Sequence, residues 1–475
     1  NTFSSRAPSL LPSGVLLLPR RPKRPRQTKR MIKSVPAVLA LVFLVATLSV
    51  EAKNPVSNVH LAVTSDPTVM VVSWLTKDAA NSTVLFGVKS NTYTGSANGS
   101  STSYSDDGGF NHNVILTGLS LGQKYFYKCG DQSQTFSGEF QFTTRTGNGY
   151  QGPWSVAFNG DIGTDHSENS IPLLNTLATN GTLDLFVHMG DISYANDHPL
   201  FYENTWNKWF GLMQPAMGKV PYMTTVGNHE SWCRNPVCAL QTLNFTTFKE
   251  KFRMPGPESG SNTNMFFSYD YKNVHFISIS SESDYPGAPL DPEPKARSFM
   301  QSWLSEDEYF QLNWITQDLQ KAQANRKNVP WIVITAHRPI YADGDYNSKG
   351  QPTGQPALIQ AWLEPLLQQY NVDFYITGHV HAYFRTYPVF NSTATANNYD
   401  NPKATIHLTS GSGGSREAIS QLPADPPSYM AFGYDQDYGV GYMNVLNDTT
   451  VTWKFYQSAT GNLIDTFTVT KPPIN

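Results

Sequence analysis

The stretch that decides the fold is Leu183-Asp184-Leu185-Phe186-Val187-His188, followed by Gly190-Asp191-Ile192-Ser193-Tyr194. The apolar run predicts a buried strand. After it the chain presents a carboxylate and, three residues later, a phenol. A carboxylate can bridge two cations, and a phenol becomes a ligand when a strongly charged metal lowers its pKa. An Asp after a strand is more often a cap or turn residue, so the interpretation depends on the other strands.

Four further predicted strands end in residues that can bind metals. Because ligands of open α/β sheets lie at the carboxyl ends of strands, we expect the five loops to meet at one edge. A single Asp, Asn or His in such a loop would be an ordinary cap, turn or packing residue, but five together favour a metal centre. The four strands and the segments that follow them are Trp154–Phe158 with Asn159-Gly160-Asp161, Val220–Val226 with Gly227-Asn228-His229-Glu230, Val329–Thr335 with Ala336-His337-Arg338, and Val372–Ile376 with Gly378-His379-Val380-His381.

The chain divides into two regions on either side of a turn-rich linker at 147–153. Residues 54–147 contain short runs separated by Gly, Asn, Asp and Ser, which predicts an all-β domain. Within it Tyr125, Tyr127 and Cys129 alternate, so they share one face, which we predict to be the inner one. Cys129 is then a buried, unpaired thiol. The pattern resembles a fibronectin III-like sandwich, with a tyrosine corner at Tyr125 or Tyr127.

Residues 151–475 have the pattern of an α/β domain. Apolar strands alternate with helical stretches near 171–178, 311–324 and 357–369, and the last antiparallel strands are expected at 440–446, 450–456 and 463–469. This C-terminal β segment, about residues 404–470, completes the domain. A further predicted strand, Val274–Ser280, ends without a metal-binding residue. The glycine-rich run at 410–414 has no Lys and no helical continuation, so a turn near the site is favoured over a phosphate cradle.

Residues 1–52 differ from the rest of the chain. They hold nine Lys/Arg and one acid, Glu51, and the first Met is Met31. From Met31 the sequence has the order of a secretory signal: a charged start, an apolar run and a small residue. An uncleaved anchor is the alternative, but the run is short for a membrane span. The whole chain carries −3 and this segment +8, so the remainder carries −11, which argues against nucleic-acid binding.

Export is also consistent with the sequons and the cysteines. The six Asn-x-Ser/Thr triplets predict N-glycosylation in an exported protein. Cys233 and Cys238 could form a loop disulfide or remain two free thiols. We therefore expect a secreted, extracellular or lumenal protein with no membrane span after signal cleavage. The glycosylation candidates are Asn81, Asn98, Asn180, Asn244, Asn391 and Asn447.

In this order the five blocks resemble the signature of the calcineurin-like metallophosphoesterases, and Tyr194 narrows the resemblance to the plant-type, high-molecular-weight purple acid phosphatases. The resemblance extends from about residue 54 to the C-terminus. It implies a two-domain protein: an N-terminal fibronectin III-like sandwich and an α/β metallophosphoesterase domain, a mixed-sheet α-β-β-α sandwich. It also implies that Fe(III) is held by Asp161, Asp191, Tyr194 and His381, and that a second divalent ion (Zn, Fe or Mn) is held by Asp191, Asn228, His337 and His379.

The same resemblance implies an acid phosphatase that hydrolyses small phosphate monoesters by in-line attack of metal-bound hydroxide. Asn228 and His229 are the expected substrate-binding residues, and His229 is the expected proton donor to the leaving oxygen. We expect Glu230 to orient His229. A diesterase or phytase-like specificity on the same site, and a silent extracellular binding protein, are the alternatives. Large relatives commonly dimerise, so a homodimer is a further expectation.

Two departures from the family pattern affect the substrate side. Plant members have further histidines after the fourth block, whereas this chain has none there; Arg338, Asp343 or Tyr346 could take their place. Phe384 stands where Glu is usual, outside the ligand set, and should affect only packing. The remaining strand histidines are interpreted as packing or surface residues. They are His60, His112, His188, His275 and His407.

Overall fold

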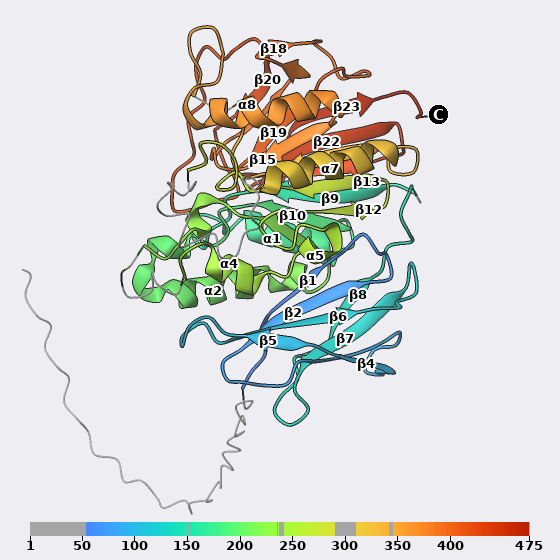
Figure 1. Cartoon of the computed structure of the whole chain (residues 1–475). Helices are drawn as coiled ribbons and strands as arrows, with labels where there is room; N and C mark the ends of the chain where they lie inside the picture. Colours follow the sequence, from blue (N-terminus) through green and yellow to red (C-terminus); the bar gives the residue numbers. More distant parts are fainter. Residues whose placement is uncertain are drawn as a thin grey trace, which may run out of the picture. The chain divides into compact units, whose positions relative to one another are not determined.

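The computed structural model describes residues 54–150, 152–234, 236, 242–289, 310–341 and 345–474. The predicted basic segment and signal, at 1–52, lie outside the described residues, as do Cys238 and Asp343. Figure 1 shows the order of the elements along the chain. The first eight strands form one region and the remaining elements form a second.

The N-terminal region is all-β, as predicted. It consists of two four-stranded antiparallel sheets, in the orders β1-β2-β6-β5 and β4-β3-β7-β8. The short runs of β-branched and aromatic residues between polar turns account for these strands. The strands are β1 (Ser57–Ala62), β2 (Met70–Thr76), β3 (Thr83–Gly87), β4 (Gly95–Asn98), β5 (Ser100–Thr102), β6 (Phe110–Leu116), β7 (Lys124–Gly130) and β8 (Phe140–Thr143).

The alternating residues of β7 face inward, as expected. Tyr125, Tyr127 and Cys129 are buried, and Cys129 is a free thiol. The hydroxyl of Tyr125 accepts a hydrogen bond from the backbone N–H of Ser120 at 2.9 Å, so Tyr125 is the tyrosine corner. Tyr127 instead donates to the carbonyl of Gly218 at 2.8 Å. This hydrogen bond therefore links the β-domain to the second region.

The second region contains two mixed sheets. One has the order β11-β10-β9-β21-β22-β23, with parallel β9, β10 and β11. The other has the order β12-β13-β14-β15-β19-β16-β20, with parallel β13, β14, β15 and β19. The strands of the first sheet are β9 (Trp154–Asn159), β10 (Leu185–Met189), β11 (Tyr222–Thr225), β21 (Gly439–Val445), β22 (Thr450–Gln457) and β23 (Leu463–Thr470). Those of the second are β12 (Phe267–Tyr271), β13 (Val274–Ser278), β14 (Trp331–Thr335), β15 (Phe374–Thr377), β16 (Tyr383–Thr386), β19 (Ile406–Ser410) and β20 (Met430–Tyr434), and β17 (Val389–Phe390) pairs with β18 (Thr393–Ala394).

Aromatic side chains join the two sheets face to face. Phe158 of β9 lies 6.3 Å from Phe276 of β13 between ring centroids, and Tyr383 of β16 stacks on Phe455 of β22 at 4.0 Å. These rings exclude water from the space between the sheets. The expected mixed-sheet sandwich of the catalytic domain is therefore confirmed.

Helices cover the outer faces of the sandwich (Figure 1). In the six-stranded sheet, α1 packs on α2 and β21. α7 lies over β12 and β13, where Asp318 bonds Ser268 and His275. The three predicted helices are present, and their observed ends differ from the predicted ones by no more than three residues. The helices are α1 (Ser170–Thr179), α2 (Tyr202–Met217), α4 (Thr246–Lys251), α5 (Gly256–Ser259), α7 (Phe310–Ala324) and α8 (Gly354–Gln369), with short 3-10 turns η1 (Ala195–Asp197), η2 (Pro199–Phe201) and η3 (Asn228–Glu230).

The five strand histidines are buried, and one of them predicts a pH-dependent stability. His275 lies between Asp270 (Nδ1 to Oδ1, 2.7 Å) and Asp318 (Nε2 to Oδ2, 2.9 Å). Burial alone would lower the pKa of His275, but the two carboxylates raise it to about 9. A raised pKa in the folded state stabilises the fold fully below about pH 6.5, and that stabilisation is lost as the pH rises through about 9.

We expect His275→Gln to lower the free energy of unfolding by roughly 2–3 kcal/mol at pH 6 and by much less at pH 9.5. Melting temperatures of wild type and variant at both pH values test this. An equal difference at the two pH values would show that the charge of His275 is not the source of its contribution.

Candidate metal centre

The five loops predicted from the strand ends do meet. They follow β9, β10, β11, β14 and β15. Backbone hydrogen bonds tie them together: the N–H of Asp161 donates to Gly190 at 3.1 Å, and that of Gly378 donates to His337 at 3.0 Å. The approach is so close that a Cβ on Gly227 would lie 2.2 Å from Asp191 Oδ1, and one on Gly378 would lie 2.4 Å from Asp161 Oδ2. Only glycine fits at these two positions.

Four of the seven candidate ligands have left-handed backbone, which is unfavourable for non-glycine residues. The four φ angles are 60° at Asp161, 50° at Asp191, 54° at Tyr194 and 70° at His379. Such a conformation persists only where the surrounding contacts impose it. The concentration of strain at these residues therefore indicates that the fold is organised to direct their side chains.

One group of candidate ligand atoms comes from Asp161, Tyr194 and His381. The Tyr194 hydroxyl lies 3.3 Å from Asp161 Oδ1 and 2.9 Å from His381 Nε2, and the last two atoms are 3.3 Å apart. Bonds of about 2.1 Å to one ion place neighbouring ligand atoms about 3.0–3.4 Å apart. The three atoms are thus spaced as the ligands of a single metal would be.

The second group comes from Asp191, Asn228, His337 and His379. His337 Nε2 is the common point: it lies 3.1 Å from Asp191 Oδ2, 3.2 Å from Asn228 Oδ1 and 3.2 Å from His379 Nδ1. These separations again match ligands of one ion. Asp191 is 2% exposed, and its Oδ2 belongs to this second group.

In four of these side chains, the polar atom that is not a candidate ligand atom contacts a backbone group. These contacts fix the orientation of the side chain and leave the ligand atom available for a metal. Asp161 Oδ2 accepts the N–H of His379 and Asp191 Oδ1 accepts that of His229, both at 2.8 Å. The Nδ1 atoms of His337 and His381 contact the carbonyls of Met189 (2.8 Å) and Ala418 (3.3 Å). A carbonyl can only accept, so each Nδ1 carries the proton and each Nε2 presents its lone pair. The residues present therefore fit two metal ions.

Burial strongly affects the phenol of the first group. Burial, together with the carboxylates of Asp161 and Asp191, raises the pKa of Tyr194 well above its usual value. The phenol consequently stays protonated unless a strong positive charge replaces its proton. That is the behaviour expected of a tyrosine that binds a highly charged cation.

Glu230 does not orient His229, so that expectation was wrong. Its carboxylate is 1% exposed and accepts three backbone N–H groups, from Asp191 (2.9 Å), Ile192 (2.8 Å) and Gly227 (2.8 Å). The side chain turns back toward the two loops because their orphan amides require an acceptor. Glu230 thus fixes the loop that carries Asp191.

His229 is oriented by Asn196 instead. Its Nδ1 lies 2.8 Å from Asn196 Oδ1, so Nδ1–H donates to the amide oxygen. Its Nε2 lies 3.9 Å from Asp191 Oδ2 and 3.4 Å from Glu417 Oε1. Burial would lower the pKa of His229, but Asp191, Glu417 and Asp197 raise it to about 9. The nearby carboxylates therefore favour the protonated form of the imidazole.

Arg338 contacts the second group. Its guanidinium forms a bidentate pair with the buried Glu282 (2.8 and 3.0 Å) and lies 2.9 Å from His379 Nε2 and 3.3 Å from Asn228 Oδ1. Glu282 lies shortly after β13, the strand that was expected to end without a metal-binding residue. The backbone of Tyr346 forms an isolated antiparallel β-bridge with Pro352. Phe384 is fully buried in β16, as its expected packing role requires.

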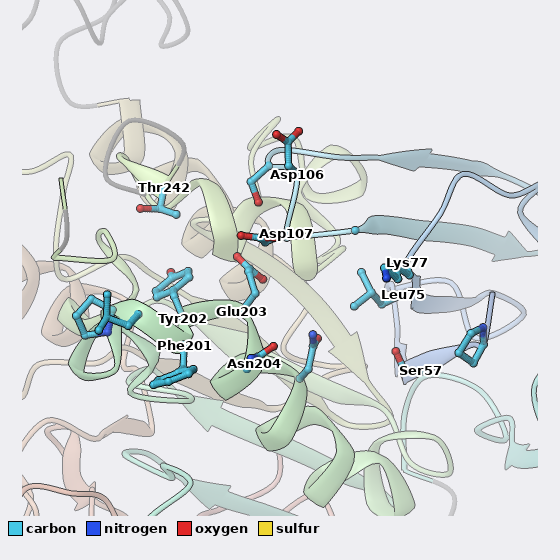
Figure 2. A pocket seen from close by; sticks show the side chains of 16 residues that line it. Ser57, Leu75, Lys77, Asp106, Asp107, Phe201, Tyr202, Glu203, Asn204 and Thr242 are labelled. Atoms are coloured by element: carbon cyan, nitrogen blue, oxygen red, sulfur yellow. The ribbon is translucent and has the colours of Figure 1, made fainter. Parts of the chain in front are cut away.

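One pocket of the described part of the chain is separate from the candidate ligands. It has a volume of about 610 Å³ and lies between the β-domain and the start of α2. Figure 2 shows residues that line it, among them Lys77, Asp106, Asp107, Phe201 and Glu203. Its described lining includes none of the seven candidate ligands.

Comparison with known proteins agrees with this geometry. Residues 56–144 match the family model described as the purple acid phosphatase N-terminal domain, residues 155–383 match calcineurin-like phosphoesterase, and residues 404–466 match iron/zinc purple acid phosphatase-like protein C. The chain is 30% identical over 404 residues to the probable purple acid phosphatase 20 of Arabidopsis thaliana, covering 84% of each chain. The chain belongs to the purple acid phosphatases.

Two further comparisons extend this result. Acid phosphatase type 7 of Mus musculus is 30% identical over 430 residues, which is 87% of this chain and 90% of the relative. A purple acid phosphatase from yellow lupin seeds has the same fold, with a TM-score of 0.71 at 21% identity over 88% of this chain and 75% of that chain. This purple acid phosphatase is therefore a binuclear-metal acid phosphatase, and its two-domain architecture is confirmed.

Proposed function

We propose that Asp161, Asp191, Tyr194 and His381 hold Fe(III), and that Asp191, Asn228, His337 and His379 hold a second divalent ion, Zn, Fe or Mn. The spacing of the two groups of ligand atoms supports this assignment. Phenolate and carboxylates are hard anionic donors that suit Fe(III), whereas imidazoles and an amide oxygen suit a divalent ion. Asp191 would be the ligand shared by the two ions, and its Oδ2 is the oxygen that the His229 N–H does not occupy.

The substrate class that we propose is small phosphate monoesters. The two cations, when bound, offset the charge of the phosphate and supply the nucleophile. His229 contributes the proton that the leaving oxygen requires. The observation that carries this role is the position of His229 Nε2, which lies 3.9 Å from Asp191 Oδ2 while Nδ1 is held by Asn196 Oδ1 at 2.8 Å. Asn228 and His229 together form the substrate-facing pair.

The proton-donor role predicts a leaving-group dependence for His229→Asn. We expect kcat to fall by roughly 10²–10³-fold on an alkyl phosphate, whose leaving oxygen must be protonated. On p-nitrophenyl phosphate, whose leaving group departs as an anion, the loss should be no more than about tenfold. Steady-state kinetics on the two substrates measure the difference.

An equal loss on both substrates would contradict proton donation and leave His229 as a phosphate-binding residue. His166→Asn is the matched control, since His166 is an exposed histidine of the loop after β9, and it should change neither rate. The same preparation tests the substrate class: higher kcat/KM on bis(p-nitrophenyl) phosphate than on the monoester would assign the site to diesters.

We propose further that the protein is exported and N-glycosylated. Five of the six sequon asparagines are exposed, and Asn447 is half-buried. Cys233 is disulfide-bonded, which is typical of oxidising compartments. Among the described residues, no helix is both long and apolar enough to cross a bilayer. Enzymatic deglycosylation of the native protein should lower its mass in several steps, and an unchanged mass would contradict the proposal.

A further inference from the structure

A sixth loop, after β19, lies over the proposed metal centre. It is fastened to His381 by the backbone: Ser420 N–H donates to the His381 carbonyl and the His381 N–H donates to Ser420 Oγ, both at 3.1 Å. The Ala418 carbonyl also contacts His381 Nδ1. These contacts fix the position of the loop next to His381, a candidate iron ligand. Glu417 is the residue of this loop that faces the site.

The carboxylate of Glu417 faces two buried histidines of the site. Oε1 lies 3.4 Å from His229 Nε2, and Oε2 lies 3.8 Å from His381 Nε2. The side chains of His229 and His381 are only 3% and 7% exposed, whereas that of Glu417 is 51% exposed. Glu417 therefore covers, from the solvent side, the nitrogen that should give its proton to the leaving oxygen.

A leaving oxygen must come within about 2.6–3.2 Å of His229 Nε2 to receive the proton. The leaving oxygen must therefore lie next to the Glu417 carboxylate or displace it, since Glu417 Oε1 is 3.4 Å from the same nitrogen. The two rim arginines do not neutralise this charge: Arg234 contacts Asp197 Oδ1 and Arg416 contacts the Asp197 carbonyl, each at 3.4 Å. A leaving group with its own negative charge therefore meets a carboxylate at short range, and a neutral or cationic one does not.

We propose that Glu417 is a specificity-determining residue that selects phosphate monoesters whose leaving group is neutral or cationic in the intact substrate over substrates whose leaving group already carries a negative charge before cleavage, such as polyphosphates. The inference rests on the proposed function, because it assumes that His229 faces the leaving oxygen. It adds the chemical class of the leaving group, which neither the ligand set nor the fold specifies.

The test compares Glu417→Gln with wild type on three substrates: O-phosphoethanolamine, p-nitrophenyl phosphate and pyrophosphate. Each substrate is compared with itself, so that differences in intrinsic reactivity cancel. We expect kcat/KM of the variant to rise roughly tenfold on pyrophosphate, to change less than threefold on p-nitrophenyl phosphate, and to fall or stay unchanged on phosphoethanolamine. Glu417→Asp, which withdraws the charge by one methylene, should lie between the two. Glu168→Gln removes an equal charge from an exposed residue after β9 and should leave all three values unchanged.

Equal changes on all three substrates, or no change on any, would overturn the role of Glu417. Failure of the proposed function has a different signature: wild-type protein with two bound metals would hydrolyse neither p-nitrophenyl phosphate nor phosphoethanolamine.

Discussion

Asp191→Ala is expected to reduce kcat for phosphate monoesters by on the order of 10³-fold or more, the largest effect on activity in this chain. Asp191 is the only residue assigned to both metals. Its Oδ2 lies 3.1 Å from His337 Nε2, and its Oδ1 fixes the backbone of His229. Removal of the carboxylate therefore deprives both ions of a ligand. It also removes the hydrogen bond that holds the backbone of His229, the proposed proton donor.

Two measurements check this prediction. Steady-state kinetics give the loss of kcat, and metal analysis of the same preparation should show fewer than two ions per chain. Asp107→Ala removes an exposed carboxylate of the β-domain and should leave both values unchanged. An Asp191→Ala protein that retains two ions and a tenth or more of the activity would disprove the bridging role.

Glu230→Ala is expected to have the largest effect on stability. The substitution leaves three buried N–H groups without an acceptor, those of Asp191, Ile192 and Gly227. Each unsatisfied buried donor costs about 1–3 kcal/mol, so we expect an apparent loss of about 3–6 kcal/mol in the free energy of unfolding. Glu230→Gln retains one acceptor oxygen and should lose less, about 1–3 kcal/mol.

Denaturant unfolding of the metal-loaded protein measures this loss. Glu258→Ala is the matched control because Glu258 forms a surface pair with Arg253, and such a pair contributes about 0–1 kcal/mol. If Glu230→Ala were no more destabilising than Glu258→Ala, the three backbone hydrogen bonds would not be what holds the Asp191 loop.

The sequence predicted those parts of the site that are encoded locally. Each of the five strand ends combines an apolar run with a Gly, Asp, Asn or His, and parallel strands within one sheet place such ends at the same edge. The sequence did not indicate that three of these ends belong to one sheet and two to the other. The β7 face of Tyr125, Tyr127 and Cys129 was predictable because alternation along one strand determines which side chains face inward.

Other features depend on contacts between segments that are far apart in the sequence. Glu230 follows His229 in the chain, but its carboxylate accepts three backbone N–H groups of other residues. Adjacency in the sequence does not show where a side chain points. Asn196 and Glu417 converge on His229 from different loops, so no spacing signals them. The helix α2 buries Trp206, Trp209 and Phe210, which lie at helical spacing. Pro215 lies within the same helix, and a proline in the sequence argues against a continuous helix there.

The visible absorption spectrum of the native protein, recorded with metal analysis of the same sample for wild type and Tyr194→Phe, tests the central claim most directly. Tyr194 bound to Fe(III) predicts a broad band near the middle of the visible range, two metals per chain including iron, and loss of the band in the folded variant. A protein that holds two metals without colour, or a band that survives Tyr194→Phe, would contradict the assignment of Tyr194 and of the iron site.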